Sequence, residues 1–262
     1  MSYILAIANQ KGGVAKTTTA AGLSGALVQE GYEVLAIDLD PQANLTIALG
    51  LNPREVRHSA ADLFIHTEKL ASLTQATSIP GLDIVPANRE MELSERFIPL
   101  RKNHELILRQ QLLASEITSA YDFVVLDCPA FLGAITTNAM VAANLLIIPT
   151  QPEYFSLHAL RNTLTQVRTV RQTFNPSLAY RILITLRDLR NRVHRTMSEH
   201  LLNTFPDGVL KTSIDLDTKL RESAATGMPV NFCYPKSRGA EQYRALATEI
   251  LEYVREKNSI PA

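Results

Sequence analysis

The chain has 262 residues, of which 46% are hydrophobic and 20% are charged, and its 26 basic residues balance its 26 acidic ones. That length suits one large α/β domain or two small ones, and the neutral balance means that binding to a polyanion must come from a local basic patch. The two cysteines, Cys128 and Cys233, have no disulfide or zinc spacing, and the sequence has neither room for a signal segment before residue 3 nor an apolar run of about 18 residues for a bilayer, so it favours the reducing cytoplasm.

Short apolar runs alternate along the chain with longer amphipathic stretches. Six runs lack polar alternation, as strands do when both faces of a sheet are covered; they are residues 3–9, 33–38, 82–87, 122–127, 145–150 and 180–186. Helices are predicted at about 17–30, 103–119, 157–174 and 192–204, with a last one at about 237–257. "HSAADLFIH" predicts a short helix within the less regular residues 50–80. This order predicts an α/β fold in one domain over residues 1–262, with a mostly parallel, twisted sheet and helices on both faces.

The stretch "QKGGVAKTTTA" (10–20) connects the first predicted strand to the first predicted helix. Main-chain N–H groups and the positive end of the helix dipole bind anions at a helix N-terminus, and glycines let phosphate oxygens approach the backbone. The stretch therefore predicts a nucleotide-binding loop made of Lys11, Gly12, Gly13, Val14, Ala15, Lys16, Thr17 and Thr18. Lys16 would reach the β- and γ-phosphates, and the Thr17 hydroxyl would bind Mg²⁺. The alternative is a glycine turn with surface lysines.

The loop pattern K-G-G-x-x-K-[ST] departs from the full G-x-x-x-x-G-K-[ST] motif, because Gln10 and Ala15 stand at its two glycines. It resembles the deviant Walker A motif of the ParA/MinD group of P-loop ATPases, usually KGGVGKTT. The resemblance implies a P-loop NTPase fold, ATP and Mg²⁺. It also implies that Lys11 is the signature lysine that reaches the partner's phosphates in a nucleotide-sandwich dimer. We expect the methyl group of Ala15 to be tolerated if the backbone there is not left-handed, at some cost in affinity or turnover.

Two further segments carry carboxylates at predicted strand ends. "AIDLDPQAN" (36–44) resembles the switch I pattern D-x-D-P-Q-x-N of this family, which implies that Asp40 orients the attacking water, Asp38 supports the metal shell and Asn44 helps to position the water. Four apolar residues run into Asp127, which suits a Walker B carboxylate for Mg²⁺. Without the other motifs, an Asp-rich turn and a buried strand that ends in Asp are the alternatives. The predicted metal site is Thr17, Asp38, Asp40 and Asp127, and the predicted catalytic residues are Lys11, Lys16, Asp40 and Asn44.

The resemblance extends over nearly the whole chain, from residue 4 to about residue 250. "IIPTQPEYFSLHAL" (147–160) and "YPKSRGAEQY" (234–243) match later family motifs, whereas Ala130 departs from the usual D-x-P-P. A MinD-type protein is expected to end in a basic membrane-binding helix. Glutamates dilute the charge here, and the apolar stripe of the last helix predicts core packing; it consists of Leu246, Ile250, Leu251 and Val254. Cys128 has no evident companion for a metal cluster and predicts a structural thiol.

The strongest partner signal is the arginine-rich stretch "LRDLRNRVHR" (186–195). Short ParA proteins bind DNA without sequence preference through basic residues, and Arg190 and Lys219 match two positions implicated in that family. Such contacts act through phosphates and counterion release. The predicted DNA-binding residues are Arg187, Arg190, Arg192, Arg195, Lys219 and Arg221. A solvated arginine-rich face is the alternative, and Asp215 and Asp217 count against a uniformly positive surface.

The sequence thus predicts a cytoplasmic, Mg²⁺-dependent ParA-like ATPase that associates with the nucleoid when ATP is bound. ATP would favour a homodimer that binds nonspecific DNA, and a ParB-like or other adaptor would stimulate hydrolysis to segregate or position DNA or a protein cargo. Alternatives are a MinD-like or carboxysome-type positioning ATPase, a metabolic P-loop enzyme of the dethiobiotin synthetase type, and a nucleotide-gated module that barely hydrolyses ATP. The adenine site is predicted only to lie near Thr185 and Asp215.

Overall fold

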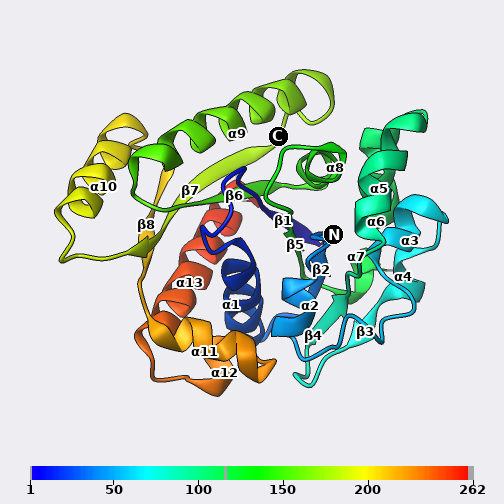
Figure 1. Ribbon diagram of the computed structural model, residues 1–262, viewed down its shortest axis with the longest axis horizontal. Coiled ribbons are helices and arrows are strands. Elements are labelled where there is room, and N and C mark those ends of the chain that lie inside the picture. The colour runs from blue at the N-terminus through cyan, green and yellow to red at the C-terminus, as the bar shows by residue number, and fades with distance from the viewer. Residues whose placement is uncertain (1, 115–116, 259–262) are drawn as a thin grey trace.

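The computed structural model describes residues 2–114 and 117–258 and contains an eight-stranded sheet with the strand order β3-β4-β2-β5-β1-β6-β7-β8 (Figure 1). The strands are β1 (Tyr3–Ile7), β2 (Val34–Asp38), β3 (Gln75–Ala76), β4 (Leu82–Val85), β5 (Phe123–Asp127), β6 (Leu145–Thr150), β7 (Ala179–Arg187) and β8 (Val209–Asp215). Neighbouring strands pair in parallel, except that the short β3 runs antiparallel to β4. The predicted α/β class and mostly parallel sheet are confirmed.

Helices follow most of the parallel strands and cover both faces of the sheet (Figure 1). In the first half of the chain they are α1 (Lys16–Gln29), α2 (Asn44–Ala48), α3 (Ala60–Ile65), α4 (Leu70–Leu73), α5 (Met91–Phe97), α6 (Ile107–Ala114) and α7 (Ile117–Ala120), with 3-10 turns η1 (Ile98–Leu100) and η2 (His104–Leu106). In the second half they are α8 (Ala134–Ala142), α9 (Tyr154–Thr173), α10 (Arg192–Thr204), α11 (Thr218–Thr226), α12 (Val230–Cys233) and α13 (Arg238–Asn258).

The sheet is buried between two hydrophobic cores because successive side chains of each strand point to opposite faces. In β1, Ile4 and Ala6 belong to the core formed with helices such as α6, α8 and α9. Leu5 and Ile7 belong to the core formed with α1, α12 and α13. The four central strands are almost wholly buried, which explains why their sequences read as continuous apolar runs.

Helices α1 and α13 pack unusually closely at Gly22. A Cβ atom on Gly22 would lie 2.5 Å from the ring of Tyr243, which is fully buried and shares a hydrogen bond of 3.3 Å with the Thr19 hydroxyl. The contact fixes α1, and therefore the loop before it, against the C-terminal helix. The apolar stripe predicted for that helix is confirmed as core, since Leu246, Ile250, Leu251 and Val254 are at most 9% exposed.

Several elements differ from the sequence prediction. The predicted helix over 103–119 is divided into η2, α6 and α7, and its residues 115–116 lie outside the described residues. Strands β3 and β8 and helices such as α5, α8 and α11 were not predicted. The short helix predicted in "HSAADLFIH" is confirmed as α3, which Ser59 and Asp62 begin with a reciprocal capping box.

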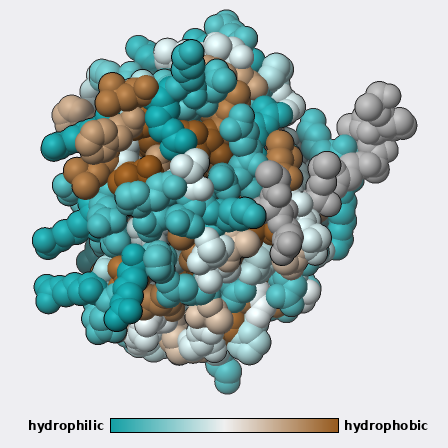
Figure 2. Space-filling model, turned by 90° about the vertical axis from the view of Figure 1, so that its right-hand side faces the viewer, coloured by the Kyte–Doolittle hydropathy of each residue, from teal (hydrophilic) through white to brown (hydrophobic). Residues whose placement is uncertain are grey.

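The face carrying α3 to α6 mixes hydrophilic surface with a group of hydrophobic side chains (Figure 2). Leu93 and Phe97 on α5 and Leu100 on η1 are among the large apolar side chains that are exposed.

Over residues 2–114 and 117–258, none of the helices combines the length and the apolar character that crossing a membrane requires.

Candidate functional site: a phosphate-binding loop and its surroundings

The predicted phosphate loop lies at the carboxyl end of β1, between that strand and α1. Asn9 holds its beginning, because its side chain donates to the Pro149 carbonyl and accepts a hydrogen bond from the Lys11 N–H. The buried Thr185 hydroxyl donates to the carbonyl of Val14. Gly13 has a φ of 72°, a left-handed conformation that favours glycine. The loop is therefore fixed to the ends of β6 and β7 and includes a turn that favours glycine.

Ala15 occupies the last position before α1 in a left-handed conformation, with φ 64° and ψ 36°. We expected its methyl group to be tolerated if the backbone at this position was not left-handed, and the structure shows that the backbone is left-handed. A left-handed conformation costs an L-residue about 1–2 kcal/mol. Ala43 and Leu186, with φ of 54° and 52°, share this conformation near the same site. Backbone strain of this kind concentrates at functional sites, where the surrounding structure holds it in place.

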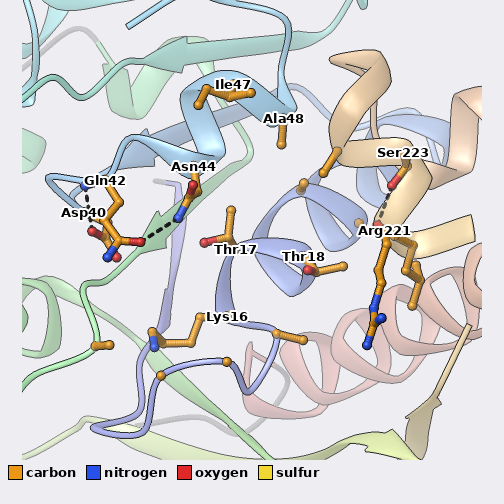
Figure 3. A pocket seen from close by; sticks show the side chains of 18 of the residues that line it. Lys16, Thr17, Thr18, Asp40, Gln42, Asn44, Ile47, Ala48, Arg221 and Ser223 are labelled. Atoms are coloured by element: carbon orange, nitrogen blue, oxygen red, sulfur yellow. Dashed lines mark hydrogen bonds between the residues drawn. The ribbon is translucent and has the colours of Figure 1, made fainter. Parts of the chain in front are cut away.

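A cavity of about 780 Å³ opens at the N-terminus of α1 (Figure 3). Its walls include the loop residues Gly12, Gly13, Ala15, Lys16, Thr17 and Thr18. Lys16 is only 7% exposed, and its ammonium group donates to the Lys11 carbonyl at 3.2 Å. Burial lowers the pKa of Lys16, while the carboxylates of Asp127 and Asp40 act in the opposite direction. Lys16 therefore lies, as a buried cation, in the region where an anion would bind.

Two buried carboxylates end neighbouring strands beside this cavity. Asp38 and Asp127 face each other in the β2–β5 register and are fully buried. Asp38 accepts hydrogen bonds from the Thr46 N–H and hydroxyl and from the Asp40 N–H. Burial nevertheless raises its pKa to about 6. Both carboxylate oxygens of Asp127 are buried with no hydrogen-bond partner, and burial together with the charge of Asp38 raises its pKa well above the usual value.

The unsatisfied oxygens of Asp127 test whether a cation fits this position. Oxygen ligands are those that Mg²⁺ prefers, and an ionised carboxylate that is buried without partners is costly unless a positive charge compensates it or it takes up a proton. Interaction with the Thr17 hydroxyl and the Lys16 ammonium lowers the pKa of Asp127, against the larger effects of burial and Asp38. Thr17 and Asp127 therefore fit a Mg²⁺ ion chemically. The oxygens of Asp38 are already engaged by α2, so Asp38 also anchors that helix.

The predicted switch I residues line the opposite wall of the cavity. Asp40, Gln42 and Asn44 follow β2, and their polar groups are linked in series (Figure 3). The Gln42 N–H donates to the Asp40 carboxylate at 2.9 Å, and the Asn44 amide donates to the Gln42 side chain at 3.1 Å. Ala130, at the unusual position of the Walker B segment, also lines the cavity. The structure thus brings Asp40 and Asn44 to the same cavity as Lys16 and Thr17.

Lys11 and Val14 are the two residues of the predicted loop that do not line this cavity. Val14 is fully buried, whereas the Lys11 side chain is held by contacts beside the loop. Its ammonium group contacts the Glu153 carboxylate at 2.9 Å and the Ser156 hydroxyl at 3.0 Å, both near the start of α9. The Lys11 side chain is 26% exposed. In the single subunit, therefore, Lys11 is held beside the phosphate loop by neighbouring residues of its own chain.

The predicted DNA-binding residues lie at the end of β7, in the segment after it and in the segment after its neighbour β8. These residues differ in their exposure and in the acidic residues that they contact. Arg187 is paired with the buried Asp215 at 2.8 Å, Arg190 is 88% exposed and binds Asp188 through two nitrogens, and Lys219 contacts Glu222 at 2.6 Å. The Arg195 guanidinium donates to the Leu189 carbonyl. The Arg190 guanidinium lowers the pKa of Asp188 to about 2, so part of the local positive charge is neutralised within the subunit.

Sequence reasoning did not place several residues at the two hollows. Arg221 was predicted to contact DNA, but it lines the main cavity beside residues of α11 and α12 (Figure 3). A second hollow of about 360 Å³ lies at the ends of β7 and β8 and is lined by Arg187, Asp188, Leu189, Arg190, Asp215, Leu216 and Arg238. Arg238 stands in the "YPKSRGAEQY" motif, which was the available signal. Leu186, with its left-handed backbone, lines the main cavity directly before Arg187.

The thiols take no part in this arrangement. Cys128 and Cys233 are free, and Cys128 is fully buried directly after Asp127. Burial raises the pKa of the Cys128 thiol, with the Asp127 carboxylate adding to the effect. A buried thiol in this neutral state is a poor nucleophile and a poor metal ligand. Cys128 therefore packs in the core, as the sequence predicted.

The glycine-containing loop between β1 and α1, together with the aspartates that end β2 and β5, defines the P-loop class of nucleotide-binding α/β proteins. A family model described as an AAA domain matches residues 2–180. The sporulation initiation inhibitor protein Soj of Bacillus subtilis is 36% identical over 95% of this chain and 98% of its own. The chromosome partitioning protein ParA of Caulobacter vibrioides is 33% identical over 98% of this chain and 96% of its own. The chain therefore belongs to the AAA-domain family and, within it, to the group that contains Soj and ParA.

Solved structures agree with this fold. The cobyrinic acid a,c-diamide synthase of Mycobacterium smegmatis with bound ADP and magnesium has a TM-score of 0.86 and 31% sequence identity to this chain, covering 100% of this chain and 99% of its own. The same protein has also been solved with an ATP analogue and magnesium. The predicted P-loop NTPase fold is confirmed, and proteins of this fold and similarity bind adenine nucleotides together with magnesium.

Proposed function

We propose that this protein is a Mg²⁺-dependent ATPase that dimerises around ATP, binds DNA without sequence preference and segregates or positions DNA or a protein cargo. The observation that carries the proposal is the pair of buried, oppositely charged groups at the phosphate loop, the Lys16 ammonium and the partnerless Asp127 carboxylate. Neither charge is well compensated within the chain, and Mg²⁺ with a triphosphate supplies the missing counter-charge to both.

In this proposal the chain's own residues position the triphosphate. The loop N–H groups and Lys16 bind the phosphates, while Thr17 and Asp127 hold Mg²⁺ with Asp38 and Asp40 around its shell. The metal, when bound, neutralises charge on the β- and γ-phosphates. Asp40 orients the attacking water with help from Asn44, which is tied to it through Gln42. We place the adenine base at Leu186, an apolar residue with a strained backbone that lines the main cavity directly before Arg187, which lines the second hollow.

The distribution of exposed apolar side chains supports a dimer through the same edge of the sheet. Phe131, Tyr154, Phe155, Leu189 and Leu216 are between 38% and 77% exposed, and each lies in the segment directly after a strand from β5 to β8. These strands flank β1 on both sides. The apolar residues therefore surround the phosphate loop, and a second subunit packed on this edge would bury them. It would also bring Lys11 near the partner's nucleotide.

Lys11 gives the sharpest test of this function. We expect Lys11→Ala to keep ATP binding while ATP-dependent dimerisation is lost and turnover falls by about 10³-fold or more, the scale of a trans-acting cation. Lys16→Ala should instead lose nucleotide affinity, and Lys69→Ala, an exposed lysine away from the loop, serves as the control. The measurements are nucleotide titration, sedimentation with ATP and steady-state hydrolysis with and without nonspecific DNA and an adaptor. Normal hydrolysis by monomeric Lys11→Ala would refute the sandwich mechanism.

A metabolic P-loop enzyme is the second candidate, because a structural relative is a cobyrinic acid a,c-diamide synthase and the main cavity extends from the loop to Met228, Pro229 and Val230 on the far side of α1. An enzyme of this kind binds a second substrate beside ATP. Its hydrolysis or transfer would depend on that substrate and would not respond to DNA. The same steady-state assay therefore separates the two functions.

A further inference from the structure

Glu153 stands between the phosphate loop and the arginine-rich segment. One of its carboxylate oxygens accepts from the Lys11 ammonium at 2.9 Å, and the other lies 3.9 Å from Nε2 of His194. Glu153 precedes α9, and His194 is in the first turn of α10; Figure 1 shows the start of α9 beside α10. The Glu153 side chain is 40% exposed, whereas that of His194 is 9% exposed. The carboxylate can therefore move, while the imidazole is held in place.

The second nitrogen of His194 holds the arginine-rich loop. Its Nδ1 accepts a hydrogen bond of 3.0 Å from the Asp188 N–H. In the neutral imidazole, the ring proton must then be on Nε2, the atom that faces Glu153. Asp188 in turn binds the backbone N–H and two guanidinium nitrogens of Arg190, each at 3.0 Å. A continuous series of contacts thus runs from Lys11 through Glu153, His194 and Asp188 to Arg190.

We propose that Glu153 is a positioning residue shared by Lys11 and His194, which couples the position of Lys11 to the conformation of the Arg190 loop. When Lys11 leaves for a partner's nucleotide, Glu153 moves to the Nε2–H of His194, and the loop that carries Arg190 becomes more ordered. This coupling rests on the proposed function, because it is the sandwich dimer that draws Lys11 away. Through this coupling, the binding of ATP would change the conformation of the loop that carries Arg190 on the proposed DNA-binding surface.

The geometry makes the exchange physically simple. Glu153 needs to approach His194 by roughly 1 Å to form an ordinary hydrogen bond, and losing the Lys11 ammonium removes the attraction that holds it back. A carboxylate bound to Nε2–H polarises the imidazole, so Nδ1 becomes a better acceptor for the Asp188 N–H. Coupling between two sites requires an element with two states. Here that element is the Glu153 side chain, which binds either Lys11 or His194.

The first test needs neither nucleotide nor DNA. Hydrogen exchange of the Asp188 amide is measured in the nucleotide-free protein, and Lys11→Ala should slow it by roughly threefold, because the released carboxylate strengthens the His194 contact. The effect should vanish when Lys11→Ala is combined with His194→Asn, whose side-chain oxygen can still accept from Asp188 but which lacks the Nε2–H. Unchanged exchange in Lys11→Ala overturns the coupling, whatever the protein's function.

The second test compares DNA affinity with a nonhydrolysable ATP analogue and with ADP. If the wild type favours DNA by on the order of 5- to 150-fold with the analogue, His194→Asn should reduce that ratio to about twofold or less while analogue binding and dimerisation persist. His200→Asn, an exposed histidine of the same helix, should retain the full ratio. A full ratio in His194→Asn contradicts the coupling. A wild type without any nucleotide-dependent DNA binding contradicts the proposed function instead, and the exchange measurement still decides the coupling.

Discussion

Ala15 shows how one methyl group affects a binding loop. Its left-handed backbone is one that glycine adopts without steric cost, and the residue lines the main cavity. The residue replaces the glycine of the commonest motif, and glycine would not carry this strain. It also shows the limit of a sequence argument, because an alanine in the sequence does not reveal its backbone φ angle.

We predict that Ala15→Gly stabilises the nucleotide-free protein by up to about 1 kcal/mol, because relief of the left-handed strain exceeds the added entropy of the unfolded chain. In a protein of this size that corresponds to a rise in Tm of about 2–4 °C. Ala20→Gly, inside α1, should lower stability by about 1 kcal/mol or more. Thermal unfolding of the two variants checks the sign, and a destabilised Ala15→Gly would show that the loop is not strained.

The Asp38–Asp127 pair predicts a pH dependence. Both folded-state pKa values are raised, that of Asp38 to about 6 from 3.8, so the folded protein binds protons more tightly than the unfolded chain. Their contribution to stability is therefore largest below about pH 4 and is lost as the pH rises through 6 and above.

We expect Asp127→Asn to be more stable than the wild type at pH 7.5 without nucleotide, by on the order of 1 kcal/mol, and to lose this advantage near pH 4. Urea unfolding at the two pH values measures the difference. The same variant should fail to gain stability from Mg²⁺ added with nucleotide, whereas the wild type gains it by mass action. An advantage that is equal at both pH values would mean that charge burial is not the cause.

At the scale of elements, the α1–α13 contact sets the position of the phosphate loop. Gly22→Ala should destabilise the protein by about 1–3 kcal/mol, because the new methyl group collides with the buried Tyr243 ring. Repeating Gly22→Ala in a Tyr243→Ala background should cost much less, since the ring is gone and alanine favours the helix. Denaturant unfolding of the four proteins gives the interaction energy, and strictly additive effects would contradict the steric explanation.

The elements that the sequence predicted correctly share a strong pattern. The six predicted strands read as apolar runs, and four of them are almost wholly buried. Helix α10 begins and ends where its amphipathic period indicated. Strand β8 was missed because it is an edge strand in which Lys211 is exposed and Thr212 half-buried. Helix α8 was missed for the opposite reason, because seven of its nine residues are buried and it has no polar face.

Motifs with fixed spacing predicted which residues share a cavity, while the roles of those residues stay predictions. Lys16, Thr17, Asp40 and Asn44 do line one cavity, as their motifs indicated. What the sequence could not supply were contacts between distant segments, such as Glu153 with Lys11 or Arg221 with the cavity. Those depend on the order of β1, β6, β7 and β8 in the sheet, which no local pattern specifies.

At the scale of the whole molecule, DNA binding should be electrostatic. Each phosphate contact contributes about 0.9 to the slope of log affinity against log salt. We predict that Arg192→Ala lowers that slope by about 1 per subunit and weakens binding equally on unrelated sequences. Arg255→Ala, in the last turn of α13, is the charge-matched control and should leave the slope unchanged. A sequence-dependent loss measured by titration at several salt concentrations would point to base contacts instead.

The hydrogen bond from the Lys16 ammonium to the Lys11 carbonyl has a mechanical consequence. Lys16, which we propose binds the triphosphate, also tethers the main chain of Lys11, the residue that the proposed dimer requires to move toward the partner's nucleotide. In the proposed nucleotide-bound state, phosphate oxygens would draw the Lys16 ammonium away from the Lys11 carbonyl, so that the contacts with Glu153 and Ser156 would be the remaining restraint on the Lys11 side chain. Under the proposed function, nucleotide binding would therefore remove the first of two restraints on Lys11, and a second subunit would have to displace only the contacts with Glu153 and Ser156.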